Sequence, residues 1–341
     1  MQDTITISCG GVSTQVKFLE HLDVRKLVDM ARQVAVFDAN TYRLFADGLQ
    51  ESVVLPEGEG AKSWQSVVSI VHAALAADLG RDDTIIAIGG GIVCDVAAFS
   101  ASVFMRGCQL VLVPTTLLAM VDAAIGGKTA LNFEGYKNIV GTFYPAKDVR
   151  VCIEVLQRLP EREYRSGMGE VVKTAMLGDQ ELFDTLRNEY RAVKSREPEV
   201  LKQIVRRCIV AKANLINRDL REAGDRVFLN LGHTFAHALE SVTMLKDWSH
   251  GEAVGWGIRR ALELGVRLGI TRPEYQEHVI EILRLYGLVR EPEGVDPDAL
   301  IAAMRKDKKK RKGELRFVLQ EALCATRLVA VDEQIVRQIF T

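Results

Sequence analysis

The first 150 residues alternate between short apolar runs and amphipathic helical patterns. Residues 34–37 and 85–88 are continuous apolar runs, which are typical of strands buried on both faces of a parallel sheet. Residues 63–79 and 92–104 instead carry apolar side chains every three or four positions, as a helix packed on a sheet does. This alternation predicts an α/β domain with a parallel sheet over residues 1–150.

The pattern changes after residue 150, where glycine becomes rarer and long amphipathic helical patterns dominate. These patterns cover residues 180–190, 198–217, 228–244, 252–268 and 273–286. We therefore expect an all-helical second domain over residues 151–341.

Composition excludes several classes of protein. Hydrophobic residues make up 48% of the 341-residue chain and charged residues 26%, as in a globular protein rather than a disordered one. The 44 Lys and Arg residues are balanced by 45 Asp and Glu residues, whereas a dedicated nucleic-acid-binding protein is usually more basic. No segment reaches the roughly 20 apolar residues that a membrane span needs. The six cysteines are scattered, so we expect reduced thiols in a cytoplasmic protein.

A glycine triplet at residues 89–91 follows one apolar run and precedes a helical pattern. Backbone N–H groups in such a turn can approach a phosphate, although the same turn also serves as a plain connection. Asp38 closes an earlier run, where a carboxylate can accept from a ribose hydroxyl or can simply lie in a loop. Glu59 and Lys62 could face a nucleotide or pair in the first turn of a helix, and Asp95 could orient the glycine turn.

Glu170, His233 and His250 carry metal-binding chemistry in helix-forming surroundings. Two His and one Glu can hold a catalytic zinc ion and leave a fourth position open for substrate. His237 lies four residues after His233 on the same helical face, so it could be a further ligand or face the substrate. The alternative is that these are ordinary hydrogen-bonded histidines.

Local spacing adds two expectations about this candidate site. Ser249 and Glu252 form a capping-box pattern, so His250 should begin a helix. Because the positive end of a helix disfavours a protonated imidazole, we expect His250 to be neutral. Lys173 follows Glu170 by three residues and should share its helical face.

Several cations could bind an anionic substrate: Arg106, Lys128, Lys137, Lys173, Lys212, Arg226 and Lys308 or Lys309. Residues 305–312 are rich in lysine, which is more typical of a solvated segment. This run lacks the interleaved aromatic residues of a nucleic-acid-binding patch.

Together these segments resemble the 3-dehydroquinate synthase family of sugar-phosphate cyclases, from Asp38 to Leu319. The motifs that carry the resemblance are residues 89–95, 104–107, 114–118, 121–122, 126–129, 137–138, 167–170, 229–235 with His237, and 250–254. Several motifs in the family's order are far more specific than the glycine triplet alone.

The resemblance implies a homodimer with an NAD-binding α/β domain and a helical domain that binds metal and substrate. It implies bound NAD and a divalent metal ion, zinc most often and cobalt as the alternative, held by Glu170, His233 and His250. The implied NAD contacts are Asp38, Glu59, Lys62, Gly90, Gly91, Asp95, Thr115, Thr116, Asp122, Lys128 and Lys137. The implied substrate contacts are Arg106, Lys128, Asn138, Lys173, Lys212, Arg226, Asn230, His237, Lys308 and Lys309. Arg106 is expected to reach across the dimer interface.

The implied reaction belongs to the shikimate pathway of aromatic amino acid biosynthesis. It converts 3-deoxy-D-arabino-heptulosonate 7-phosphate to 3-dehydroquinate and phosphate. Transient oxidation by NAD acidifies a neighbouring C–H, phosphate leaves by β-elimination, the hydride returns, and an intramolecular aldol step closes the ring. Cations that hold carboxylate and phosphate let one site perform these steps.

Three alternatives stay open at this point. One is another sugar-phosphate cyclase, and one is a metal- and NAD-dependent polyol dehydrogenase, for which the phosphate-binding cations would have no purpose. The third is a non-catalytic paralogue. Tyr136 and Arg158 keep this last alternative open, because the family commonly has glycine and threonine at these positions.

Overall fold

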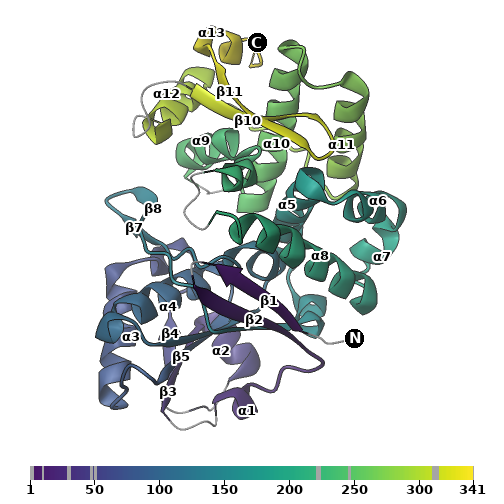
Figure 1. Cartoon of the computed structure of the whole chain (residues 1–341). Coiled ribbons are helices and arrows are strands. Elements are labelled where there is room, and N and C mark those ends of the chain that lie inside the picture. Colours follow the sequence, from purple (N-terminus) through teal and green to yellow (C-terminus); the bar gives the residue numbers. More distant parts are fainter. Residues whose placement is uncertain are drawn as a thin grey trace. The chain divides into compact units, whose positions relative to one another are not determined.

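The structure is a computed structural model that describes residues 4–9, 11–28, 32–46, 49, 52–219, 224–244, 247–308 and 315–340 (Figure 1). The chain divides into two compact units. The first comprises Met1–Leu159 and Lys212–Arg221, and the second comprises Pro160–Ala211 and Glu222–Thr341. Among the helices described, none is both long and apolar enough to cross a membrane.

The first unit is built on a seven-stranded sheet with the order β1-β2-β9-β6-β5-β3-β4. Its strands are β1 (Thr4–Cys9), β2 (Val12–Leu19), β3 (Gln33–Asp38), β4 (Ser52–Leu55), β5 (Thr84–Gly89), β6 (Gln109–Pro114) and β9 (Asp148–Cys152). β1 is antiparallel to β2, and all other pairs are parallel. The predicted parallel-sheet α/β domain is therefore confirmed.

Helices and short turns connect these strands and cover the sheet. They are α1 (Val24–Val28), α2 (Ala39–Phe45), η1 (Glu59–Ala61), α3 (Trp64–Ala76), α4 (Gly91–Val103), η2 (Phe104–Arg106), η3 (Ala119–Ala123) and η4 (Ile153–Arg158). A small two-stranded sheet pairs β7 (Leu131–Phe133) with β8 (Tyr136–Val140). β3 and β5 are buried along nearly their whole length, which explains their continuous apolar sequence.

The second unit is mostly helical, as expected, with one β-hairpin that the all-helical expectation did not include. Its helices are α5 (Glu161–Gly178), α6 (Gln180–Asn188), α7 (Tyr190–Lys194), α8 (Pro198–Ile216), α9 (His233–Thr243), α10 (His250–Arg267), α11 (Pro273–Leu285), α12 (Pro297–Lys308) and α13 (Glu333–Arg337), with the turn η5 (Asp225–Asn230). The last turns of α8 belong to the first unit. β10 (Leu315–Ala322) and β11 (Ala325–Val331) form an antiparallel hairpin, the yellow arrows of Figure 1. Phe317 of β10 stacks on Phe235 of α9, with ring centroids 4.9 Å apart. The hairpin therefore packs against an apolar side chain of α9 within the same unit.

One predicted helix, residues 228–244, is interrupted before the candidate metal site. Gly232 adopts a left-handed φ of 77° and forms the N-cap of α9. A Cβ at Gly232 would lie 2.7 Å from the backbone nitrogen of Ile258, so only glycine fits between the helices. As a result, His233 is the first residue of α9.

Candidate active site

The carboxyl ends of β3 and β5 lie side by side, because residues 33–36 pair in parallel with residues 84–87. From β3 the chain continues to β4 on one side, and from β5 it continues to β6 on the other. Ligand sites of open α/β sheets form at such a topological switch point. Asp38 ends β3 and Gly89 ends β5, so the two predicted nucleotide-binding segments meet there.

The glycine turn packs tightly between β5 and α4. Gly90 is the N-cap of α4, and a Cβ on it would lie 3.2 Å from Cγ2 of Thr116. A Cβ on Gly91 would lie 3.3 Å from Cβ of Ala123. Thr115 donates its backbone N–H to the carbonyl of Gly89 at 2.9 Å. The turn therefore places backbone N–H groups without covering side chains at a helix N-terminus, an arrangement that suits a phosphate.

Asp38 also has a local structural role. Its Oδ1 accepts hydrogen bonds from the backbone nitrogen of Thr41 at 2.8 Å and from the Thr41 hydroxyl at 2.9 Å. Asp38 is thus the N-cap of α2 in a capping box, which fixes its carboxylate at the switch point.

Lys62 and Asp95 form a buried ion pair beside the turn. Nζ of Lys62 lies 2.5 Å from Oδ2 of Asp95 and donates to Oδ1 of Asn138 at 2.9 Å. Burial raises the pKa of Asp95, and the Lys62 ammonium opposes that shift. Lys62 thus bridges a cofactor candidate, Asp95, and a substrate candidate, Asn138.

Lys212 pairs with Asp122 inside the first unit. Its Nζ lies 2.5 Å from Oδ1 of Asp122 and donates to the Asp122 carbonyl at 2.6 Å. This contact joins the end of α8 to η3, although 90 residues separate the two in sequence. Asp122 was implied to contact NAD and Lys212 to contact substrate, so the two candidates are in direct contact.

The remaining candidates of the first unit vary in exposure. Thr115 is buried, and Oγ1 of Thr116 accepts from the backbone nitrogen of Ala119 at 3.1 Å. The exposed cations are Lys128, Lys137 and Arg106, and Arg106 adopts a left-handed φ of 62°. Tyr136 begins β8 without a left-handed φ, whereas its neighbours Glu134, Gly135 and Asn138 adopt that conformation. The tyrosine therefore fits this loop.

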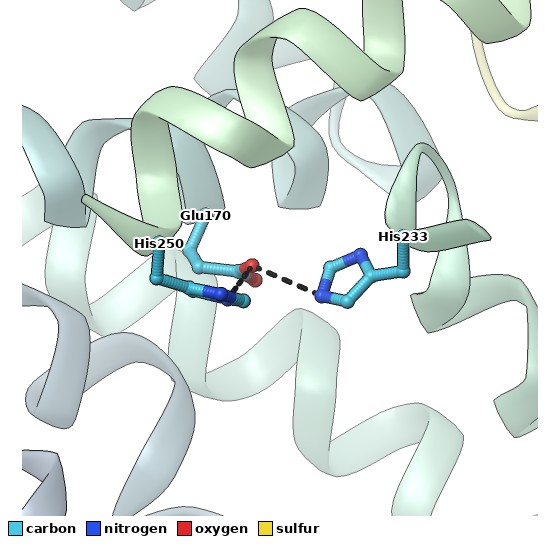
Figure 2. A group of neighbouring side chains, drawn as sticks. All are labelled: Glu170, His233 and His250. Atoms are coloured by element: carbon cyan, nitrogen blue, oxygen red, sulfur yellow. Dashed lines mark ion pairs between the residues drawn. The ribbon is translucent and has the colours of Figure 1, made fainter. Parts of the chain in front are cut away.

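In the second unit, three side chains far apart in sequence converge (Figure 2). Oε1 of Glu170 on α5 lies 3.4 Å from Nε2 of His233 on α9 and 3.3 Å from Nε2 of His250 on α10. The Glu170 side chain is 1% exposed. Its other carboxylate oxygen lies 2.5 Å from Nζ of Lys173, as expected for a shared helical face.

These three residues fit a divalent metal ion. Oε1 of Glu170 is buried and accepts no well-aligned hydrogen bond among the described residues, although two imidazole nitrogens face it. Ligand atoms at zinc-binding distances around a tetrahedral centre lie about 3.3 Å from one another. The ligand atoms of the cluster all lie within 4.8 Å of one another, and the two histidine contacts of Glu170 match the tetrahedral spacing.

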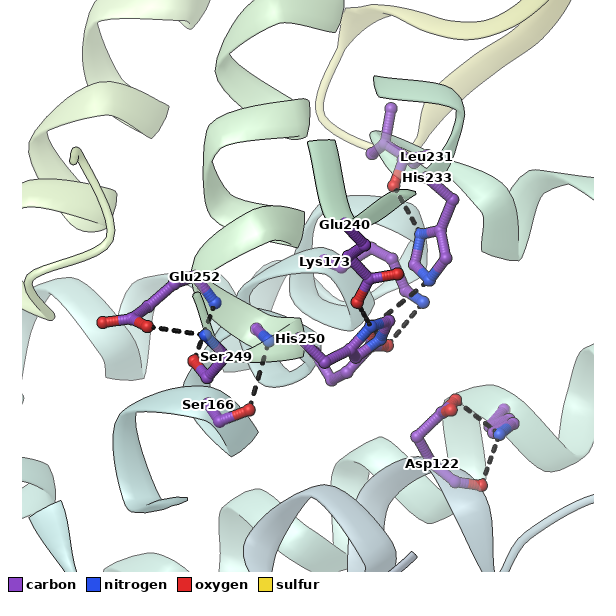
Figure 3. A network of polar contacts seen from close by, with 12 residues as sticks. Asp122, Ser166, Lys173, Leu231, His233, Glu240, Ser249, His250 and Glu252 are labelled. Carbon is purple, nitrogen blue, oxygen red and sulfur yellow. Dashed lines mark hydrogen bonds and ion pairs between the residues drawn. The ribbon is translucent and has the colours of Figure 1, made fainter. Parts of the chain in front are cut away.

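His250 is held by a second carboxylate (Figure 3). Its Nδ1 lies 3.0 Å from Oε1 of the buried Glu240 on α9. Figure 3 also shows the predicted capping box, in which the Ser249 backbone N–H donates to Oε2 of Glu252 at 2.9 Å. Carboxylates that orient the outer nitrogen of a histidine are typical of metal centres. Glu240 had no signal in the sequence beyond its position within a helix.

The helix N-terminus is not the main influence on the charge of His250. Burial disfavours the charged imidazole, but the two neighbouring carboxylates, Glu170 and Glu240, outweigh burial and raise the pKa of His250 to about 10. Two carboxylates around one imidazole contribute more than the dipole of a helix end. The surroundings therefore favour a positive charge at this point, whether a proton or a metal ion supplies it.

His233 has the opposite character. Burial and the nearby Lys173 ammonium lower the pKa of His233 well below its usual range, so its imidazole is neutral. Its Nδ1 lies 3.2 Å from the Leu231 carbonyl, a contact that favours a proton on Nδ1 and leaves Nε2 with a lone pair. That lone pair faces Oε1 of Glu170, so both atoms could donate to one cation bound beside them.

Two glycines let α5 and α10 cross at backbone contact. A Cβ on Gly251 would lie 2.5 Å from the backbone carbon of Ser166 and closer still to its oxygen. A Cβ on Gly169 would lie 2.7 Å from Cα of Gly251. Gly251 follows His250 and Gly169 precedes Glu170. The crossing therefore fixes how close the Glu170 carboxylate and the His250 imidazole come.

The other candidates of the second unit lie on η5 and α9. Arg226 is buried on η5, and Asn230 ends that turn. His237 is exposed on α9, and its ring centroid lies 5.3 Å from that of His233. Lys309 and the side chain of Lys308 lie outside the described residues.

Known proteins match almost the whole chain. Residues 52–166 match the sequence profile described as 3-dehydroquinate synthase N-terminal, and residues 167–310 match the one described as 3-dehydroquinate synthase C-terminal. The 3-dehydroquinate synthase of Acidithiobacillus ferrooxidans is 40% identical over 294 residues, which is 83% of this chain and 81% of the relative. The 3-dehydroquinate synthase of Halorhodospira halophila is 40% identical over 311 residues, 91% of this chain and 87% of the relative.

A solved structure shares the same architecture. The 2-epi-5-epi-valiolone synthase of Streptomyces hygroscopicus, with NAD+ and Zn2+ bound, has a TM-score of 0.87 and 27% sequence identity, and the match covers 98% of this chain and 97% of that one. Both profiles and both curated relatives indicate the same enzyme family. The two relatives are 40% identical to this chain, whereas the valiolone synthase is 27% identical. The chain belongs to the 3-dehydroquinate synthase family.

Proposed function

We propose that this chain is a 3-dehydroquinate synthase that acts in the shikimate pathway. It converts 3-deoxy-D-arabino-heptulosonate 7-phosphate to 3-dehydroquinate and phosphate. The observation that carries the proposal is the Glu170–His233–His250 cluster in a chain 40% identical to two curated synthases. The paired Lys173 supports it, because this cation lies against the cluster where a substrate hydroxyl would bind.

NAD and zinc are the proposed cofactors. The valiolone synthase structure contains NAD+ and Zn2+, and the donor set of one carboxylate and two imidazoles suits zinc. When bound, NAD takes up and returns a hydride, and the metal ion polarises a hydroxyl oxygen. We assign NAD to the first unit, at Asp38, the glycine turn, Lys62 and Asp95. We assign the metal ion to the second.

Within this proposal, the chain's own residues bind the substrate's charges and manage its protons. Lys173 is 2% exposed, so its ammonium acts with little solvent screening and can stabilise a negatively charged oxygen beside Glu170. The proposed partners of the carboxylate and phosphate are Arg226, Asn230, His237, Lys212, Asn138, Lys128, Lys308, Lys309 and Arg106. Few of these groups are bases, which suits a leaving phosphate that removes a proton itself.

We further propose a homodimer in the cytoplasm. Apolar side chains are exposed on α3, at the end of α4 and on η2, namely Trp64, Val68, Val103 and Met105. Arg106 follows this surface, and both it and Met105 adopt left-handed φ angles. A second copy that covered the surface would therefore meet Arg106. Cys94, Cys108, Cys152, Cys208 and Cys324 are free thiols, which a reducing compartment would keep reduced.

A turnover assay tests the proposed activity. The chain is incubated with 3-deoxy-D-arabino-heptulosonate 7-phosphate, zinc and a trace of NAD, and phosphate, 3-dehydroquinate and NADH are followed together. Equal amounts of phosphate and 3-dehydroquinate without accumulated NADH support the proposal. Accumulated NADH from simple polyols would instead indicate a dehydrogenase. Phosphate released only from other sugar phosphates would indicate another cyclase. Glu170→Gln serves as the inactive control.

A further inference from the structure

Asn132, in the middle of β7, links three segments that the proposed function assigns to different ligands. Its Nδ2 donates to Oε1 of Glu59 at 2.8 Å, and its Oδ1 accepts from the backbone nitrogen of Asn138 at 2.9 Å. Its own backbone nitrogen donates to the carbonyl of Lys62 at 2.9 Å. The side-chain amide thus uses a donor and an acceptor at the same time.

The bond to Asn138 compensates for an irregular strand pairing. Leu131 pairs with Val140 and Phe133 with Tyr136, so β8 carries two more residues than β7 across this interval and the register shifts. Such a bulge leaves backbone groups without their ladder partners. The amide oxygen of Asn132 binds the N–H of Asn138 inside the bulge. Asn138 there adopts a left-handed φ of 51°, which is uncommon for a residue other than glycine.

Asn138 is held from its other end as well. Its Oδ1 accepts from Nζ of Lys62, and the same ammonium pairs with Asp95. Glu59, Asn132, Asn138, Lys62 and Asp95 therefore form one continuous chain of polar contacts. A hairpin of two short strands has little stability by itself, so its position depends on such anchors.

We propose that Asn132 is a positioning residue that couples the NAD contacts Glu59 and Lys62 to the substrate contact Asn138. The inference rests on the proposed function, because those three roles belong to it. Removal of the amide would release Glu59, free Asn138 from its left-handed conformation and let the β7–β8 hairpin move. NAD would then bind more weakly and the substrate KM would rise, although Asn132 itself contacts neither ligand.

Exchanged side chains provide a sharp test. Asn132→Asp keeps the acceptor for Asn138 but sets a carboxylate against that of Glu59. Adding Glu59→Gln restores a donor–acceptor pair with its direction reversed and the same net charge. We expect Asn132→Asp to raise the NAD dissociation constant about tenfold, the loss of one charge-assisted hydrogen bond. If the two residues acted independently, the double variant's NAD dissociation constant would rise by the product of the two single-variant factors. We expect a smaller rise than that product.

Calorimetric titration of the zinc-loaded protein with NAD measures these affinities, and steady-state kinetics measure the substrate KM. Asn188→Asp, at the exposed end of α6, is the matched control and should bind NAD like the wild type. Equal NAD affinity in wild type and Asn132→Asp, or a double variant without any rescue, would overturn the proposal. A wild type that binds NAD but forms no 3-dehydroquinate would contradict the proposed activity alone, because the titration still measures how Asn132→Asp changes NAD affinity. A wild type that does not bind NAD would overturn both.

Discussion

The crossing of α5 and α10 gives a prediction with a calculable size. Gly251→Ala would place a methyl group 2.5 Å from the backbone carbon of Ser166 and even closer to its oxygen. Backbone atoms cannot rotate away as a side chain can, so the helices must separate. Overpacking of a core usually destabilises by about 1–3 kcal/mol, and a collision with backbone belongs at the upper end. For a unit of about 150–250 residues, 3 kcal/mol lowers the melting temperature by about 6–12 °C.

The same displacement should weaken the metal site, because Gly251 directly follows His250. Calorimetry of the zinc-free protein measures the melting temperature, and competition with a chromogenic chelator measures zinc affinity. Gly178→Ala, at the end of α5, is the matched control because a Cβ there meets nothing within 4 Å. It should change stability by less than about 1 kcal/mol. A Gly251→Ala protein that melts within about 2 °C of wild type and binds zinc normally would refute the reasoning.

Three further predictions concern the site itself. Glu240→Gln replaces the charged partner of His250 by a neutral one and should weaken zinc binding about tenfold by chelator competition at pH 8, whereas Glu263→Gln on α10, the helix that carries His250, should not. Glu170→Gln should abolish stable zinc binding and turnover while circular dichroism stays that of wild type; retention of full activity without zinc would exclude the metal role. Arg226→Ala should raise the substrate KM about 10- to 100-fold with kcat less affected, and unchanged kinetics would remove Arg226 from the carboxylate site.

The spacing of residues in the sequence correctly predicted contacts between residues three or four positions apart. The capping box of Ser249 and Glu252 and the shared helical face of Glu170 and Lys173 were both confirmed, because these contacts lie within one helical turn. The continuous apolar runs likewise predicted the buried parallel strands, of which β5 is an example.

Contacts between residues far apart in the sequence were not predicted. Glu240 lies ten residues from His250 on another helix, and nothing in its surroundings marks it as a partner, so its effect on the pKa of His250 was not predicted. Asn132 meets Glu59 across 73 residues. The β10–β11 hairpin was missed because its pattern is short and lies among helical ones. The assignments of NAD and substrate residues, and the domain boundary at residue 150, stay predictions.

The order in which the chain is synthesised has a consequence for the first unit. Its segment Lys212–Arg221 is separated from Leu159 by the whole of Pro160–Ala211, which belongs to the second unit. At about 5–20 residues per second, a ribosome needs roughly 3–10 s to make that insertion. Asp122 therefore emerges long before the Lys212 that pairs with it. Until Lys212 emerges, the nascent first unit lacks this ion pair, and a protein cut at Leu159 would lack it permanently.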